Sequence, residues 1–200
     1  YIPYIYDASV LTTSSGQVNF WKNYGAVAAL IAQEVPCVEL ELLVSKAELP
    51  VVTRVYGAHC IQQSKRKLLD NYFNFIEKNP VNFEDRHLFI SEPGKDDTHY
   101  SIYQDSHGTH VFATNDLHLM NQLPLLAEIK AEKWYLDGIY TPGEDFVTVV
   151  KAYDHARKLL ETGKWTAESI SSLDETVKNA HPQNRELDTG FFLYTAEKVQ

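Results

Sequence analysis

An alternation of strand-like and helix-like segments over residues 1–60 constrains the fold of this chain most strongly. Strands are indicated by β-branched, aromatic or continuous apolar runs, and helices by apolar residues at helical spacing. In chain order the segments are a strand at residues 2–6, a helix at 17–24, a strand at 27–32, a helix at 36–45 and a strand at 51–56. Gly57 is predicted to end the third strand. This order predicts a parallel sheet with helices packed outside it.

The middle of the chain departs from this alternation. A helix is predicted at residues 65–75, and short β-rich runs follow at 88–90, 100–103 and 110–113. The last two runs flank Asp105-Ser106-His107-Gly108, which is typical of a hairpin turn. We interpret this part as an insertion with its own small sheet.

The βα pattern then returns, with a helix predicted at residues 117–131 and a strand at 134–136. Thr141-Pro142-Gly143-Glu144 has the form of a capping box that begins the next helix. The chain therefore divides into βα units of a partial barrel (residues 1–60), a helix plus small β insertion (61–114), the final βα units of the barrel (115–163), and a C-terminal helix and tail (164–200). Its four βα-type strands are half of what a closed eight-stranded barrel requires.

Open parallel edges expose unpaired backbone groups. We therefore expect either that two chains pair as a homodimer to cover those edges, or that the insertion caps the sheet. Because a strand-like run follows Tyr1 at once, we also expect a piece of a longer protein.

Composition narrows the classes of function. The chain has 200 residues, is 44% hydrophobic and carries a net charge of −9, which excludes a disordered tail and disfavours direct binding to nucleic acid or an anionic membrane. No apolar run approaches the roughly 20 residues that cross a bilayer. Cys37 and Cys60 are the only cysteines, so we expect no disulfide framework and a cytoplasmic location.

Active sites of βα folds lie at the carboxyl ends of the strands. That rule selects Asp7, Glu34, the pair His59-Cys60 and Asp137. Asp137 is the sharpest candidate, because Gly138 follows it and a helix begins shortly afterwards. A carboxylate there is suited to act as a general base or to bind a substrate cation or amide, and the alternative is that it only binds loop amides or a neighbouring cation. Glu34 has the same two interpretations.

The remaining polar clusters are weaker candidates. His59-Cys60 lacks the spacing of a zinc or iron–sulfur site, and neighbouring residues rarely form a nucleophile–base pair. Five histidines lie in the middle segment, but no carboxylate or cysteine completes a spaced metal motif. Lys65-Arg66-Lys67 is a small basic cluster that is either a solvated face or a site for one or two phosphates. No phosphate-binding loop, dinucleotide fingerprint or zinc-protease motif is present.

Taken together, several stretches resemble peptidase family U32, the collagenase-like proteases. The resemblance spans nearly the whole chain, in order, and four stretches carry it. The first two are Val18-Asn19-Phe20-Trp21-Lys22 with Ala32-Gln33-Glu34, and Val55-Tyr56-Gly57-Ala58-His59-Cys60 with the segment from Ser64 to Tyr72. The other two are Tyr135-Leu136-Asp137-Gly138 with the following helix, and the tail from Arg185 to Phe192. It implies that the fold is the C-terminal half of a (β/α)8 TIM-type barrel, with the first half upstream.

The departures from the family pattern are equally informative. Full members resemble iron–sulfur proteins with four cysteine ligands, whereas here only Cys60 stands at such a position and Lys67 occupies the second. The resemblance therefore points to a shorter, cysteine-poor branch, for which we expect no iron–sulfur cofactor and leave a divalent metal open. The matching polar residues that remain are Glu34, Arg66, Asn71, Tyr72 and the acidic residue Asp137.

Two functions follow from the resemblance. The first is a hydrolase with peptidase activity on a peptide or protein substrate, in which Asp137 and Glu34 are catalytic and Arg66, Asn71, Tyr72 and His59 bind substrate. The alternative is an accessory protein without a cluster, a partner to a full-length paralogue, that supports hydroxylation of a tRNA or rRNA pyrimidine. An inactive member of the family is the third possibility.

Overall fold

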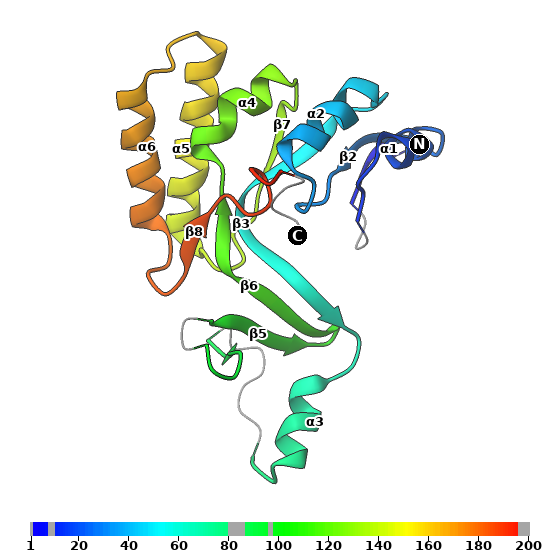
Figure 1. Cartoon of the computed structure of the whole chain (residues 1–200), viewed down its shortest axis with the longest axis vertical. Coiled ribbons are helices and arrows are strands. Elements are labelled where there is room, and N and C mark those ends of the chain that lie inside the picture. The colour runs from blue at the N-terminus through cyan, green and yellow to red at the C-terminus, as the bar shows by residue number, and fades with distance from the viewer. Residues whose placement is uncertain (1, 8–10, 80–86, 96–97, 196–200) are drawn as a thin grey trace.

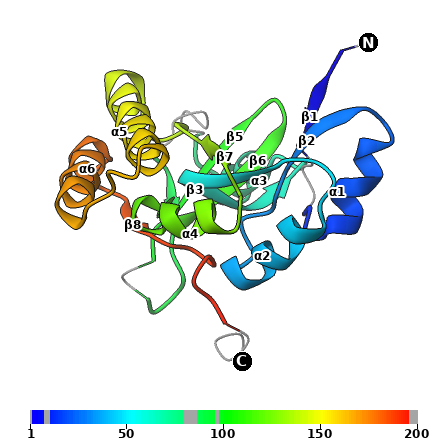
Figure 2. The same cartoon turned by 90° about the horizontal axis from the view of Figure 1, so that it is seen from above.

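The computed structural model describes residues 2–7, 11–79, 87–95 and 98–195 and contains one open, mixed sheet with helices packed against it (Figures 1 and 2). Its strands are β1 (Tyr4–Tyr6), β2 (Ala26–Leu30), β3 (Val51–Ser64), β4 (Phe89–Ile90), β5 (Tyr100–Asp105), β6 (Gly108–His118), β7 (Lys133–Leu136) and β8 (Glu186–Asp188). The main strand order is β1-β2-β3-β6-β5-β4, with β7 paired to β3 and β8 to β6. The fold is therefore α/β, with a sheet that is not closed into a barrel.

The helices follow the strands in the order that the alternation predicts for the first part of the chain. They are α1 (Ser15–Lys22), α2 (Cys37–Lys46), α3 (Leu68–Phe75), the short 3-10 turn η1 (Met120–Gln122), α4 (Leu123–Glu128), α5 (Gly143–Glu161) and α6 (Ala167–Ala180). Local chemistry starts two of them: Ser14 and Gln17 form a capping box before α1, and Thr166 and Ser169 form one before α6. Among the described residues, none of the helices has the length and apolarity that a membrane crossing demands.

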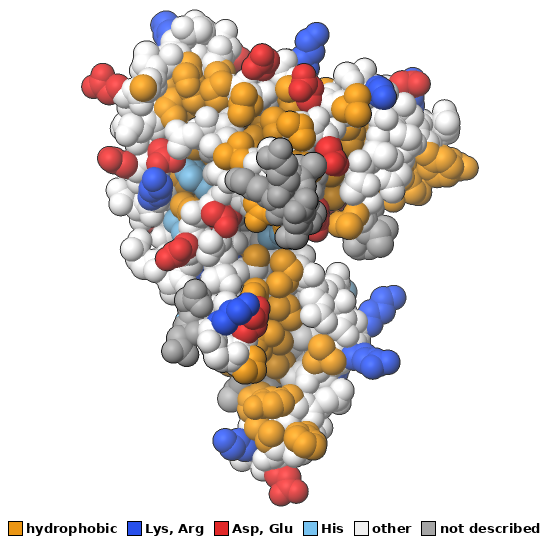
Figure 3. Space-filling model, in the orientation of Figure 1, with side chains coloured by type: hydrophobic (Ala, Val, Ile, Leu, Met, Phe, Trp, Pro, Cys, Tyr) orange, Lys and Arg blue, Asp and Glu red, His pale blue; other side chains and the backbone are white. Residues whose placement is uncertain are grey.

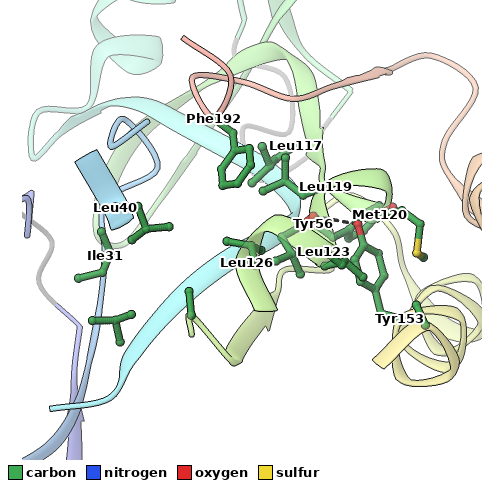
Figure 4. Close-up of a cluster of buried hydrophobic side chains, with 14 of the residues drawn as sticks. Ile31, Leu40, Tyr56, Leu117, Leu119, Met120, Leu123, Leu126, Tyr153 and Phe192 are labelled. Atoms are coloured by element: carbon green, nitrogen blue, oxygen red, sulfur yellow. Dashed lines mark hydrogen bonds between the residues drawn. The ribbon is translucent and has the colours of Figure 1, made fainter. Parts of the chain in front are cut away.

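The four βα strands pair in parallel. β1 pairs with β2, β2 with the first residues of β3, and β3 with β7. Apolar residues of this layer meet those of α4, α5 and the tail in one core, where Tyr56, Leu119, Leu123 and Tyr153 are almost completely buried (Figure 4). This core fixes the positions of the strand ends that carry the polar candidates.

The third strand does not end at Gly57, contrary to the sequence-based expectation. β3 continues to Ser64, and its second half pairs antiparallel with β6 and extends away from the body (Figure 1). Gly57 has a φ of +114°, a conformation that a glycine adopts without strain, and irregular pairing follows between Ala58 and Gln62. Gly57 therefore redirects the strand instead of ending it.

The expectation of a separate small sheet is also wrong. β5 pairs with β6 and β6 with β3, so the hairpin belongs to the main sheet. Its turn is the predicted one, because Asp105 pairs with Gly108 around Ser106 and His107. We call the second half of β3, α3, β4, β5 and the paired part of β6 the arm.

Two further expectations are corrected. Leu117 and His118 end strand β6 instead of beginning a helix, because the strand continues to pair with β3 through Tyr56. Helix α5 begins at Gly143 with Pro142 as its N-cap, so Thr141 caps nothing. The Thr141 hydroxyl instead lies 2.8 Å from the Tyr56 hydroxyl in the core.

Candidate functional site

A hollow of about 320 Å³ lies where the parallel strands end. Asp7 follows β1, Glu34 follows β2 and Asp137 follows β7, and all three carboxylates line this hollow together with Arg54 and His59 of β3. The carboxyl ends of parallel strands meet at one edge of a sheet, which explains why residues so distant in sequence come together. The structure thus brings together all the candidates chosen by the strand-end rule, which are Asp7, Glu34, His59, Cys60 and Asp137.

Asp137 is held in place by donors from two sides. Its Oδ2 accepts a hydrogen bond from Arg54 Nη1 at 3.1 Å, and its Oδ1 accepts one from the Ile139 backbone N–H at 3.0 Å. The side chains of Arg54 and Asp137 are 19% and 22% exposed, so the ion pair is largely shielded from solvent. Such charge-assisted hydrogen bonds fix the orientation of a carboxylate.

Two glycines make this placement possible. The backbone N–H of Asp137 donates to the Tyr56 carbonyl at 2.9 Å, which brings the end of β7 against β3. A Cβ at Gly57 would lie 2.3 Å from the Asp137 carbonyl oxygen, and one at Gly138 would lie 2.7 Å from the Phe146 ring. Gly57 and Gly138 therefore allow the close approach that positions Asp137.

Glu34 pairs with His59 on another side of the hollow. His59 Nε2 lies 3.2 Å from Glu34 Oε1, and the His59 ring packs edge-on against Phe191 of the C-terminal tail. The Glu34 side chain is 36% exposed and the His59 side chain 17%, so the glutamate is the more exposed partner of the pair. Each of the two predicted acids thus has its own basic partner.

This arrangement suits binding better than water activation. The Asp137 carboxylate already accepts hydrogen bonds from Arg54 and Ile139, which fix its orientation. Burial raises the pKa of the Cys60 thiol, and that thiol donates to the Gln62 carbonyl at 3.4 Å, so Cys60 lacks the features of an activated nucleophile. Within the described residues, no group of three or more His, Cys, Asp or Glu side chains is arranged to hold a metal ion.

The other predicted substrate-binding residues lie elsewhere. Arg66 precedes α3, and Asn71 and Tyr72 lie within it, at the far end of the arm, where all three are exposed. None of them lines the hollow. The family resemblance that selected these residues predicts only their order along the chain. In space, the length of the extended arm separates them from Asp137.

Sequence reasoning missed Arg54 and Gln33, which also line the hollow. Arg54 had a usable signal, because it is the one cation in the otherwise uncharged strand Val51–Tyr56 and a charge there requires a partner. Gln33 immediately precedes Glu34 after the end of β2, and the sequence offered it only as part of the family-like stretch Ala32-Gln33-Glu34.

Comparison with known proteins assigns the class. The family model of Peptidase family U32 matches residues 2–200, and the chain belongs to this family. It is 28% identical over 181 residues to tRNA hydroxylation protein P2 of Bacillus subtilis (strain 168), an alignment that covers 87% of this chain and 57% of that protein. It is 22% identical to tRNA hydroxylation protein P1 of the same organism, over 88% of this chain and 42% of that protein.

The chain therefore spans little more than half of one of these relatives and less than half of the other. No solved structure matches it. An iron–sulfur cluster of the kind that the family resemblance implies does not fit this chain, since a four-iron cluster needs about four cysteine thiolates. The sequence has only Cys37, at the start of α2, and Cys60, in β3.

Proposed function

We propose that this chain belongs to a protein that takes part in hydroxylation of a tRNA pyrimidine, as an accessory component without an iron–sulfur cluster. The observation that carries the proposal is that both curated relatives are tRNA hydroxylation proteins that match most of this chain. The hollow supports it, because fixed hydrogen-bonding groups such as Asp137 and His59 suit recognition of a neutral ligand. A cytoplasmic location and a full-length paralogue as partner are part of this proposal.

The arm supplies a second contact surface in this proposal. Lys65, Arg66 and Lys67 are exposed side by side, and Asn71 and Tyr72 are exposed on the adjoining helix. A local basic cluster attracts phosphates even on a chain of net charge −9, because interactions beyond about 10 Å are screened by salt. Arg66, Asn71 and Tyr72 would then contact the RNA strand outside the hollow.

The four parallel strands would be the second half of a (β/α)8 barrel. They support this because they pair side by side in a parallel layer, and because, among the described residues, β1 pairs only with β2 and β7 only with β3. An unpaired edge needs a cover, which a second copy of the chain would provide in the isolated state. Light scattering tests this: a dimer is expected, and a monodisperse monomer would contradict the pairing.

The function is tested in cells. The gene is deleted in a strain that also lacks any redundant paralogue, and hydroxylated uridine and cytidine are measured in purified tRNA by mass spectrometry. We expect the hydroxylated nucleoside to disappear and to return when the gene is restored. An unchanged level in the deletion strain would refute the proposed function.

Peptidase activity is the second candidate, and the observation in its favour is that Asp7, Glu34 and Asp137 line one hollow in a member of a peptidase family. Carboxylates can activate water directly or through a metal. The purified protein is incubated with gelatin and peptide libraries, with and without divalent metals. Cleavage that Asp137→Asn abolishes would favour this candidate, and intact substrates would remove it.

A further inference from the structure

A second hollow of about 240 Å³ adjoins the first, and Gln33 and His59 line both. Its remaining wall comes from the arm and from the C-terminal tail, including Phe191 and Tyr194. We propose that this second hollow receives a pyrimidine base, stacked on Phe191 and bound at a ring carbonyl by Gln33. The inference rests on the proposed function and assigns its base-binding residues.

The aromatic wall is exposed and firmly anchored. Phe191 and Tyr194 are 37% and 39% exposed, and their ring centroids lie 5.2 Å apart at an angle of 70°. Between them in sequence, Phe192 is buried in the core, and its carbonyl accepts a hydrogen bond from the Cys37 N–H at 2.9 Å. A planar ring held in this way is a ready surface for base stacking, since every base has a π-face.

The start of the tail is fixed as well. Buried Arg185 donates from Nε to both carboxylate oxygens of Asp116, at 3.0 and 2.9 Å. The Gly190 N–H donates to Asp188 Oδ1 at 2.8 Å, which closes the turn before Phe191. The stacking surface is therefore positioned before any ligand arrives, which lowers the entropy lost on binding.

Gln33 offers an amide that lacks a partner. Its side-chain nitrogen is buried and, among the described residues, has no hydrogen-bond acceptor. An unsatisfied buried donor is unfavourable, so a ligand carbonyl that pairs with it is favoured. A pyrimidine ring carries at least one carbonyl group, which is an acceptor for this amide.

Charge decides which part of an RNA enters. Asp188 lines the second hollow, and Asp7, Glu34 and Asp137 line the first. These carboxylates repel phosphates and leave a neutral base as the favoured occupant. His59 lines both hollows, so a base on Phe191 would lie beside the hollow that contains Asp137.

The test measures binding of the purified full chain to a short oligouridine and to an abasic oligonucleotide of equal length. Oligouridine is expected to bind more tightly than the abasic strand. Phe191→Ala should weaken oligouridine binding by roughly tenfold to a hundredfold, because stacking on one aromatic ring contributes about 1–3 kcal/mol. Phe191→Trp should restore it. Phe20→Ala, which removes an aromatic side chain that is 51% exposed on α1, is the matched control and should change nothing.

A second variant tests the proposed hydrogen bond between Gln33 and the base. Gln33→Met removes the amide donor at similar size without adding a charge, and should weaken oligouridine binding about fivefold while leaving binding of the abasic strand unchanged. Equal binding of both strands, or wild-type affinity in Phe191→Ala, would overturn the inference even if tRNA hydroxylation depends on the gene. Binding of an unstructured peptide that Phe191→Ala abolishes, without binding of oligouridine, would also overturn it. Loss of the proposed function is recognised separately, by unchanged tRNA hydroxylation in the deletion strain.

Discussion

The two halves of β3 show how one strand serves two regions of different character. Residues 51–58 are mostly buried, between β2 and β7 in the body, and supply Arg54 to the hollow. Most of the residues from 60 to 64 are exposed and pair with β6 in the arm, which carries apolar side chains on its face and basic ones on its flank (Figure 3). Burial in the body fixes the carboxylates, whereas exposure in the arm leaves charged and aromatic side chains available to a partner.

The largest expected effect concerns the junction of these regions. Gly57→Ala should destabilise the protein by roughly 3–5 kcal/mol, because it combines a positive φ with overpacking against Asp137. Gly94→Ala, in the arm, is the matched control: its φ is +82°, but no atom lies within 4 Å of the added Cβ, so it should cost only about 1 kcal/mol. Urea denaturation measures both, and equal costs would show that β3 does not depend on the close contact with Asp137.

The next effect compares a shielded ion pair with an exposed one. A double-mutant cycle with Arg54→Met and Asp137→Asn should give a coupling energy of about 1–3 kcal/mol, because both side chains are largely shielded from solvent. The pair Lys22–Glu48 is the control: its side chains are 47% and 59% exposed, and its coupling should not exceed about 1 kcal/mol. A smaller coupling for Arg54–Asp137 than for the control would contradict the fixed carboxylate.

The body should also respond to pH. Burial lowers the pKa of His118 although Asp174 lies 2.8 Å away, and burial also lowers the pKa of His181. In the unfolded state the histidine pKa is about 6.5, so below that pH the unfolded state binds more protons than the folded state. The free energy of unfolding is therefore highest above that pH and falls as the pH drops below it.

The expected slope below the unfolded pKa is up to about 1.4 kcal/mol per pH unit for each histidine. Denaturation curves from pH 8 to pH 5 measure it, and replacing both His118 and His181 by Gln should flatten the profile. An equally steep fall in the double variant would assign the pH dependence to other groups.

The smallest effect on stability belongs to the arm. Arg66→Ala should change the free energy of unfolding by less than about 0.5 kcal/mol, because the side chain is exposed. It should weaken RNA binding and reduce the slope of log affinity against log salt by about 1, as expected for one lost phosphate contact. Lys151→Ala, which removes an exposed cation on α5, is the control. An unchanged salt slope would remove Arg66 from the proposed RNA surface.

The sequence predicted best where local pattern and burial agree. The strand–helix order around β1, β2 and β3 and the hairpin turn at Ser106-His107 follow from periodicity and turn chemistry, and the strand-end rule located Asp7, Glu34 and Asp137. These features depend on neighbours in sequence or on a general property of parallel sheets.

The sequence-based predictions that were wrong share a different cause. A glycine is typical of a strand end, but whether Gly57 ends or redirects β3 depends on pairing with β6, which begins 51 residues later. The pattern at Leu117 and His118 predicts the start of a helix because their strand partners, Gly57 and Tyr56, lie 60 and 62 residues earlier in the chain. The charge of Arg54 signals that it has a partner, but the identity of that partner, Asp137, and the position of Phe191 beside His59 are tertiary contacts without a local signal.

The most direct test of the central claim, that the hollow around Asp137 supports tRNA hydroxylation, is a complementation experiment. The deletion strain receives either the wild-type gene or the Asp137→Asn variant, at equal protein levels, and hydroxylated pyrimidine in tRNA is measured by mass spectrometry. We predict that the wild type restores the modification and that Asp137→Asn restores less than about a tenth of it, as expected for a lost interaction of about 1.4 kcal/mol or more. Full restoration by Asp137→Asn would contradict the account.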